Sequence, residues 1–167
     1  MISTIKQVKD RILQLIAFHA PGAKSLRVRL HRWRGVKIGQ GVWIGYQALL
    51  DTSCPHLISL GDNVIISIRA MLISHFRGPK GITIEDDAFI GPGAIILPNV
   101  TIGRGAVVTA GSVVSSSIQP MTVVQGNPAR PIATCGVTLG EKTTMGQFLH
   151  SLRPLARHSD PQRAYSR

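Results

Sequence analysis

His75 stands at the point where a regular six-residue pattern in the sequence is interrupted. A histidine has an ordinary pKa near neutrality, so its imidazole can take up or return a proton during a reaction. Other polar residues could share a site with it, because His56 lies in the insertion CPHL and both Gln47 and Asp51 lie in the preceding stretch of the pattern. The alternative for each of these residues is an exposed position in a turn without a chemical role.

The two cysteines, Cys54 and Cys135, have no spacing typical of a metal site or a redox motif. We expect two reduced, packed thiols, which fits a reducing cytoplasm.

The elements that would position His75 are defined by the six-residue period itself, which covers residues 36–53, 58–75 and 82–117. Such a period matches neither the 3.6 residues of a helical turn nor the spacing of hairpins, but it suits a short strand followed by a turn. Three such units make one coil, and stacked coils form an all-β parallel β-helix. The third residue of every unit is aliphatic and should fill the interior: Ile38, Ile44, Leu50, Leu60, Ile66, Leu72, Ile84, Ile90, Ile96, Ile102, Val108 and Val114.

Two segments interrupt the pattern. The residues CPHL shift its phase, and the stretch FRGPKG places Gly78 at an interior position and Pro79 where a central strand would need an N–H donor. We therefore expect an extruded loop or a distorted turn over 76–81, with His75 at its base.

The net charge of +11 is uneven: +7 over residues 1–35, +1 over 36–135 and +3 over 136–167. No nucleic-acid-reading motif accompanies it, so we expect no nucleic-acid partner. The sequence divides into a basic N-terminal helical segment (1–35), a β-helix domain (36–132) and a C-terminal cap with a flexible tail (133–167). In the cap, a short helix from Thr144 to Leu155 is expected.

The N-terminal segment has apolar residues at helical spacing and basic residues mostly on the other side of the predicted helix. Two roles are open for it. The helix could pack on the first coil and close the end of the β-helix, or its charge could bring the protein to an anionic membrane surface. The apolar positions are Ile5, Val8, Ile12, Leu15 and Ile16.

Residues 26–132 resemble the hexapeptide-repeat acyltransferases, in particular the bacterial sugar O-acetyltransferases that act on maltose, galactosides and colanic acid. The resemblance is most specific in the elements IGPGAIILP, VTIG, TAGSVV and GNPAR, which occur in the order and spacing of that family. It implies a left-handed parallel β-helix, a homotrimer with active sites between neighbouring subunits, and acetyl-CoA as the acetyl donor.

The resemblance also implies roles for individual residues. His75 occupies the place of the general base, Gly91, Ala110 and Ser115 lie beside the pantetheine arm of acetyl-CoA, and Arg130 lies near its phosphates.

The sequence departs from the family pattern at two positions, with Ser116 where a lysine is common and Asn99 where glycine is usual. The phosphate contact would then depend more on Arg130, or on Lys80 or Arg104 of a neighbouring subunit. Asparagine can replace glycine in a left-handed turn.

The expected function is acetyl transfer from acetyl-CoA to a sugar hydroxyl in polysaccharide, capsule or lipopolysaccharide biosynthesis. His75 would act as general base without a metal ion, and Gln47, Asp51 and His56 would contact a saccharide or a nucleotide- or lipid-linked sugar. The expected location is the cytoplasm, with the inner face of the membrane as a possible site of action.

Three alternatives remain open: an N-acetyltransferase of an amino or nucleotide sugar, a non-catalytic β-helix scaffold, and a γ-type carbonic anhydrase. The last needs three histidines around zinc, including two that are five residues apart, and the repeat has no such pair.

Overall fold

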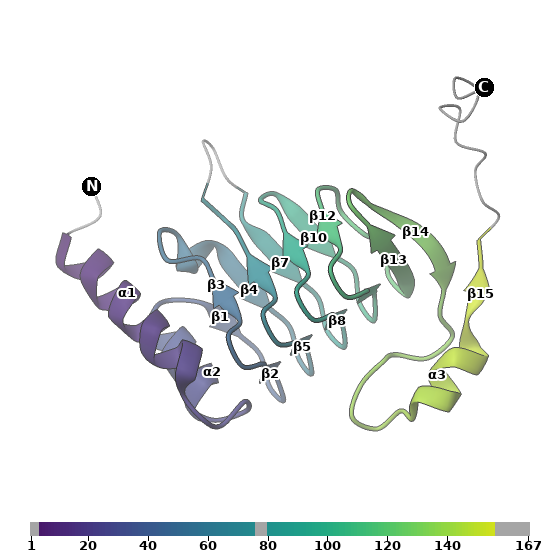
Figure 1. Ribbon diagram of the computed structural model, residues 1–167, viewed down its shortest axis with the longest axis horizontal. Helices are drawn as coiled ribbons and strands as arrows, with labels where there is room; N and C mark the ends of the chain where they lie inside the picture. The colour runs from purple at the N-terminus through teal and green to yellow at the C-terminus, as the bar shows by residue number, and fades with distance from the viewer. Residues whose placement is uncertain (1–3, 76–79, 156–167) are drawn as a thin grey trace, which may run out of the picture.

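Each hexapeptide unit forms a strand of two or three residues followed by a turn, and successive units wind around one aliphatic interior (Figure 1). The computed structural model describes residues 4–75 and 80–155. Within this part of the chain, the first sheet contains the parallel strands β1 (Lys37–Ile38), β4 (Ile58–Leu60), β7 (Ile82–Ile84) and β10 (Val100–Ile102). The third sheet contains β3 (Leu49–Leu50), β6 (Met71–Leu72), β9 (Ile95–Ile96) and β12 (Val113–Val114).

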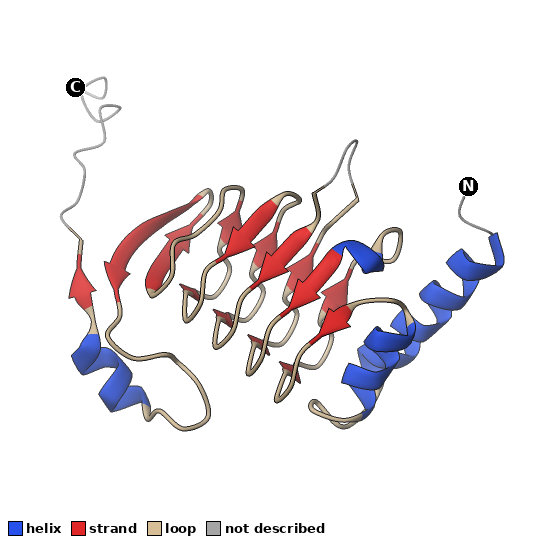
Figure 2. Ribbon diagram, turned by 180° about the vertical axis from the view of Figure 1, so that it is seen from behind, coloured by secondary structure: helices blue, strands red, loops and turns tan. Residues whose placement is uncertain are grey.

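The second sheet is longer because the C-terminal segment extends it. Its parallel part contains β2 (Trp43–Ile44), β5 (Ile65–Ile66), β8 (Phe89–Ile90), β11 (Val107–Val108) and β13 (Thr122–Gly126). Two antiparallel strands follow, β14 (Ala129–Thr134) and β15 (Arg153–Pro154). The short connection CPHL forms the 3₁₀ turn η1 (Pro55–Leu57), visible in Figure 2 beside the strands.

The interior consists of ladders of the predicted aliphatic residues. Leu50 pairs with Leu72, and Leu72 pairs with Ile96, so each side chain stacks on its counterpart in the next coil. All twelve of these residues belong to the interior; eleven are buried, and Ile38, in the first coil, is partly buried against the rest. The prediction of a left-handed parallel β-helix is confirmed, and dense packing of one residue type explains why the pattern is so regular.

Two turn residues show what the repeat requires of the backbone. Asn99 has a φ of 63°, so the asparagine adopts the left-handed conformation expected of it. Gly91 has a different reason to be glycine, because a Cβ atom there would lie 2.6 Å from the carbonyl oxygen of Val108 in the next coil. Contact between coils therefore accounts for Gly91 without any ligand.

Two helices, α1 (Thr4–His19) and α2 (Leu26–Trp33), lie at the end of the β-helix that begins with the first coil (Figures 1 and 2). The predicted helix is present, and α1 contacts the first coil through Gln14 rather than through its apolar side. The buried side of α1 carries Asp10, Gln14 and Ala17, whereas Ile12 and Leu15 are exposed.

The reason lies in the backbone of the first coil, which has no preceding coil to hydrogen-bond with its strands. Side chains of the helical segment bind these carbonyl groups instead. Gln14 donates to the carbonyl of Ala48 over 3.2 Å, and Arg32 donates to that of Gly39 over 2.7 Å. Buried carbonyl groups must be paired, so the cap of a parallel β-helix has to present polar side chains.

The C-terminal segment covers the outer face of the second sheet. Helix α3 (Met145–Ser151) starts at the N-cap Thr144, whose side chain forms a capping box with Gln147. The helix is shorter than expected because the chain then pairs as β15 with β14. Phe148 packs into a cluster with Val107 and other residues of this sheet. The predicted loop over 76–81 and the predicted tail lie largely outside the described residues.

Candidate active site

Asp51 and His75 form a hydrogen-bonded pair between adjacent coils. Oδ2 of Asp51 lies 2.5 Å from Nδ1 of His75 and also accepts the backbone N–H of His75 over 2.8 Å. The two residues come together because the register places Leu50 on Leu72, so the turns that follow these strands lie on one another. The Asp51 side chain is 1% exposed, whereas that of His75 is 58% exposed.

The carboxylate of Asp51 is fully engaged by donors. Oδ2 accepts the N–H of Ser74 over 2.7 Å, and Oδ1 accepts the N–H groups of Ser53 and Cys54 over 2.7 and 3.2 Å. Burial alone would raise the pKa of Asp51, but hydrogen bonds from His75, Ser53, Ser74 and Cys54 outweigh it and lower the pKa below its ordinary value. Asp51 is therefore a buried carboxylate anion at neutral pH, and the interpretation as an exposed turn residue is wrong.

This pairing defines the chemistry available to the imidazole. A carboxylate only accepts hydrogen bonds, so Nδ1 of His75 carries the proton that points at Asp51. In the neutral ring the basic nitrogen is then Nε2, on the far side of the ring from Asp51. The same anion stabilises the imidazolium formed when Nε2 takes up a proton, which is the arrangement of a general base with an orienting carboxylate.

Arg34 fixes the backbone on which Asp51 sits. Its Nη2 donates to the carbonyl groups of Leu50 and Asp51 over 2.7 and 2.5 Å, and its Nη1 binds Gln14 of α1. Burial, opposed by the charges of Asp10 and Asp51, lowers the pKa of Arg34 to about 10, so the guanidinium stays charged at neutral pH. The N-terminal cap and the candidate base are thus connected through one buried side chain.

His31 completes this buried cluster. Its Nδ1 lies 2.8 Å from Nη1 of Arg34. Burial, together with the charges of Arg34 and Arg27, lowers the pKa of His31 to about 3. The neutral ring accepts a hydrogen bond from the guanidinium, so His31 supports Arg34.

Cys54 is close to this site but is no nucleophile. Burial and the charge of Asp51 raise the pKa of its thiol, which therefore stays protonated at neutral pH. Its carbonyl accepts a hydrogen bond from Oγ of Ser74 over 2.9 Å, which ties the turn with η1 to the turn with His75. His56 lies in η1 with an exposed side chain, at the same edge as His75.

The remaining predicted residues lie on two edges of the β-helix. We call the turns that join the third sheet to the first the base edge (residues 51–57, 73–75, 80–81, 97–99 and 115–117), because His75 belongs to it. Ser115 lies on this edge two coils beyond His75, as the pairing of β6 with β9 and of β9 with β12 requires. The turns that join the second sheet to the third form a separate edge, and Gln47, Gly91 and Ala110 lie there.

A pocket of about 410 Å³ lies at the far end of the base edge. Ser116, Gln119 and Arg130 line it, and the guanidinium of Arg130 is exposed. Ser116, the position where a lysine was expected, and Arg130 therefore contact the same space. Arg130 can supply a positive charge there without a lysine.

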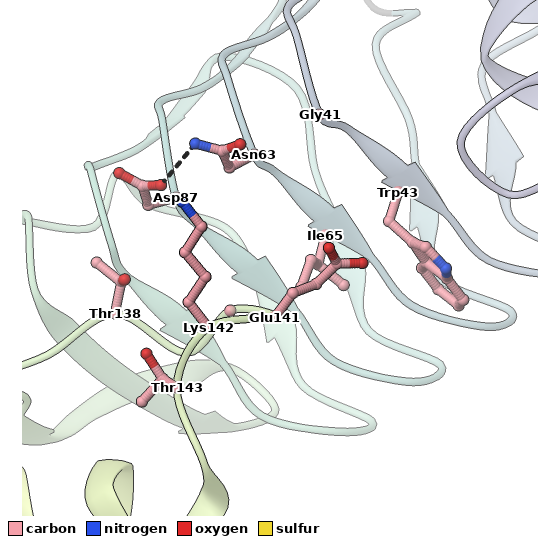
Figure 3. A pocket seen from close by; sticks show the side chains of 10 residues that line it. Gly41, Trp43, Asn63, Ile65, Asp87, Thr138, Glu141, Lys142 and Thr143 are labelled. Carbon is pink, nitrogen blue, oxygen red and sulfur yellow. Dashed lines mark hydrogen bonds between the residues drawn. The ribbon is translucent and has the colours of Figure 1, made fainter.

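A smaller pocket of about 180 Å³ lies at the third edge, where the first sheet joins the second (Figure 3). The side chain of Lys142 points toward Asp87, which accepts a hydrogen bond from Asn63 over 3.1 Å. Among the described residues that line this pocket there is no histidine. In residues 4–75 and 80–155, no group of three or more potential ligands could hold a metal ion.

Some of these relationships had a signal in the sequence and some did not. Leu50 pairs with Leu72, so one coil spans 22 residues, and counting by that length places Asp51 on Ile73, two residues before His75. Counting the six-residue units would also have shown that Gln47 lies one turn before Asp51, on another edge of the β-helix. Arg34 had no such signal, because it lies outside the repeat.

Comparison with known proteins identifies the family of this chain. Residues 81–116 match the family model described as bacterial transferase hexapeptide (six repeats). The Bacillus subtilis (strain 168) protein named "Putative acetyltransferase YvoF" is 34% identical over 138 residues, which cover 78% of this chain and 78% of the relative.

Two solved structures are similar to about three quarters of this chain. The hexapeptide-repeat acetyltransferase VCA0836 of Vibrio cholerae superimposes with a TM-score of 0.54 at 25% identity, covering 78% of this chain and 90% of that one. Soybean serine acetyltransferase gives a TM-score of 0.53 at 28% identity. The match covers 77% of this chain but only 56% of the soybean chain. With its repeat, its coil geometry and its relatives in agreement, this chain belongs to the hexapeptide-repeat acetyltransferase family.

Proposed function

We propose that the protein is an acetyl-CoA-dependent O-acetyltransferase that acts on a sugar hydroxyl, with His75 as the general base. The observation that carries the proposal is the contact between Nδ1 of His75 and the buried carboxylate of Asp51. Family membership supports acetyl transfer, and the resemblance to sugar O-acetyltransferases supports a saccharide acceptor.

The pair favours a hydroxyl acceptor for a physical reason. A hydroxyl group keeps its proton at neutral pH and becomes a strong nucleophile only as that proton is removed. Nε2 of His75 takes the proton while the acceptor oxygen attacks the thioester carbonyl. The tetrahedral intermediate then expels the thiolate of coenzyme A, which receives the proton from the imidazolium. Asp51 holds the ring and stabilises its positive charge, so it is a positioning residue and its oxygens are not available to the sugar.

The donor would lie along the base edge from His75 toward Arg130. Two strand spacings of about 4.8 Å separate the coil of His75 from that of Ser115, so the reach is roughly 10 Å. Ser115 would contact the pantetheine arm, and Arg130 would pair with phosphate.

Gly91 and Ala110 lie on a different edge of the same chain, so they can reach a donor bound along the base edge only from a neighbouring subunit. A trimer, which is typical of the family, provides such a neighbour. The outward residues of the third sheet support that assembly, because they form an apolar row that the described part of this chain leaves only half-buried: Leu49, Met71, Ile95 and Val113.

The two remaining predicted residues, His56 and Gln47, lie on different edges of the β-helix. His56, exposed on the base edge, is the candidate contact to the acceptor. Gln47 accepts a hydrogen bond from Nε of Arg69 over 2.8 Å on the other edge. It could reach an acceptor only across a subunit interface.

The test uses purified protein, acetyl-CoA and a panel of monosaccharides, oligosaccharides and nucleotide sugars, with release of the free thiol as the readout. We expect an acetylated product whose linkage is cleaved by hydroxylamine, as an ester is. A hydroxylamine-resistant amide on an amino sugar would instead establish the N-acetyltransferase alternative.

Binding of the donor can be measured separately, by thermal unfolding with and without coenzyme A. Saturation at about 100 times Kd should add about 2.7 kcal/mol to the free energy of unfolding. A well-folded trimer with no shift would favour the scaffold alternative.

A further inference from the structure

Helix α1 carries a row of exposed apolar side chains. Their positions follow the 3.6-residue helical repeat, so they lie on one side of the helix. The exposed fractions are 82% for Ile5, 51% for Val8, 51% for Ile12, 66% for Leu15 and 49% for Ile16. We call these five residues the α1 stripe.

The α1 stripe faces away from the rest of the chain. The opposite side of the helix carries Asp10, Gln14 and Ala17, which are 3%, 4% and 2% exposed and pack toward α2 and the first coil. Gln14 is fixed there by its bonds to the carbonyl of Ala48 and to Arg34. The helix therefore cannot rotate to bury its apolar side without breaking the cap, and contiguous exposed apolar surface of this kind marks an interaction site.

The charges around the α1 stripe are of one sign. Lys9 and Arg11 flank the stripe on its two sides, as the helical repeat requires. In the described residues of α1 and α2 the acidic side chain is Asp10, which is buried. The exposed basic residues of α1 are Lys6, Lys9 and Arg11.

We propose that α1 lies on an anionic lipid bilayer, with the α1 stripe in the interfacial region and the basic residues at the lipid headgroups. A helix with an apolar side bordered by lysine and arginine is the kind that binds in the plane of such a surface. Each basic residue near an anionic surface contributes attraction. A second copy of α1 would bring the same positive charges together, which disfavours self-association through the stripe. This inference does not depend on the proposed acetyl transfer.

The mode of contact is peripheral. No helix in the described residues has the length and apolar character needed to cross a bilayer. Trp33 is 63% exposed and adjoins α1, because Nζ of Lys9 donates to its backbone carbonyl over 3.2 Å. Tryptophan favours the interface between water and lipid, so the exposed Trp33 is suited to contact the same bilayer.

The experiment is sedimentation of the full-length protein with vesicles of phosphatidylcholine alone or of phosphatidylcholine with phosphatidylglycerol. We expect binding to the anionic vesicles that salt weakens, and little binding to the neutral ones. The double variant Ile12→Ser/Leu15→Ser should weaken binding to anionic vesicles about tenfold or more, and Lys6→Glu/Arg11→Glu should do the same. Both pairs are exposed, so circular dichroism and thermal unfolding should stay unchanged.

A matched control changes exposed apolar residues at the other end of the molecule. Val137→Ser/Leu149→Ser removes side chains that are 38% and 56% exposed, and it should leave vesicle binding as in the wild type. Equal binding to neutral and anionic vesicles, or unchanged binding by both α1 variants, would overturn the proposal. A fall in oligomeric state of Ile12→Ser/Leu15→Ser in analytical ultracentrifugation, without vesicle binding by the wild type, would assign the stripe to a second copy.

Discussion

Nδ1 of His75 lies 2.5 Å from Oδ2 of Asp51, and the same oxygen accepts the backbone N–H groups of His75 and Ser74. One buried oxygen atom thus fixes the backbone and the ring of the candidate base together. The ring of His75 stays accessible, while its orientation is set by a carboxylate that solvent does not reach.

Asp51→Asn should lower kcat by roughly 10²- to 10⁴-fold, the range typical of impaired general base catalysis. An amide cannot accept the Nδ1 proton and the four neighbouring backbone protons in the same way, so the tautomer with a basic Nε2 is no longer favoured. Initial rates of thiol release give kcat and KM, and KM for acetyl-CoA should change little. Unchanged kcat in a folded variant would contradict the role of Asp51.

Arg34→Met should lower both the free energy of unfolding and kcat. The variant leaves the carbonyl groups of Leu50 and Asp51 without their buried donor, which costs about 3 kcal/mol. Arg29→Met changes an exposed residue of α2, the helix that Arg34 follows as C-cap. This control should change the free energy of unfolding by less than about 0.5 kcal/mol. Urea unfolding of both variants tests this, and equal stability would show that Arg34 does not hold the cap.

The pH dependence of stability should report His31. Its pKa in the folded protein is lowered to about 3, whereas an unfolded histidine titrates near 6.5, so acid favours the unfolded chain. The stabilising contribution is complete above about pH 6.5 and is lost as pH falls from there toward the folded pKa. Between pH 6.5 and 5 the free energy of unfolding should fall by about 2 kcal/mol from this residue alone.

His31→Gln provides the comparison for that measurement, because glutamine can accept the bond from Arg34 but does not titrate. Urea unfolding of the variant should show a smaller loss of stability over the same pH interval. An identical pH dependence in the variant would mean that His31 is protonated in the folded protein.

Gly91→Ala should destabilise the β-helix by about 1 to 3 kcal/mol, because its Cβ atom would meet the backbone of the next coil. The control is Gly140→Ala, where no atom of the described residues lies within 4 Å of an added Cβ atom. Thermal unfolding of the two variants should differ clearly. If Gly91→Ala is as stable as Gly140→Ala, another cause must explain this glycine.

The fold was largely predictable because the stacking of coils repeats the same packing problem every six residues. Leu72 and Ile96, which stack on each other in adjacent coils, are both aliphatic. A repeat of aliphatic residues at every sixth position can be recognised in a single sequence. The buried side of α1 was not predictable from its apolar residues, because the cap satisfies the carbonyl groups of a distant first coil. The buried side of the cap therefore carries the polar residues Gln14 and Arg34. The helical spacing of the apolar residues in α1 would have favoured an apolar buried side instead.

The candidate site was predictable only in part. His75 could be found from the interruption of the repeat and the family resemblance. The role of Asp51 depends on the register between coils, which the sequence shows only after the coil length is known. Gln47 lies in the same coil as Asp51 but one turn earlier, and a single turn moves a residue to another edge of the β-helix.

The most direct test of the account compares wild-type protein with His75→Ala at saturating acetyl-CoA and the best acceptor from the sugar panel. His150→Ala, an exposed histidine in α3, serves as the matched control. We predict that His75→Ala keeps its oligomeric state and its thermal shift with coenzyme A but loses roughly 10²- to 10⁴-fold in kcat, while His150→Ala turns over like the wild type. Undiminished turnover in folded His75→Ala protein would contradict the assignment of His75 as the general base.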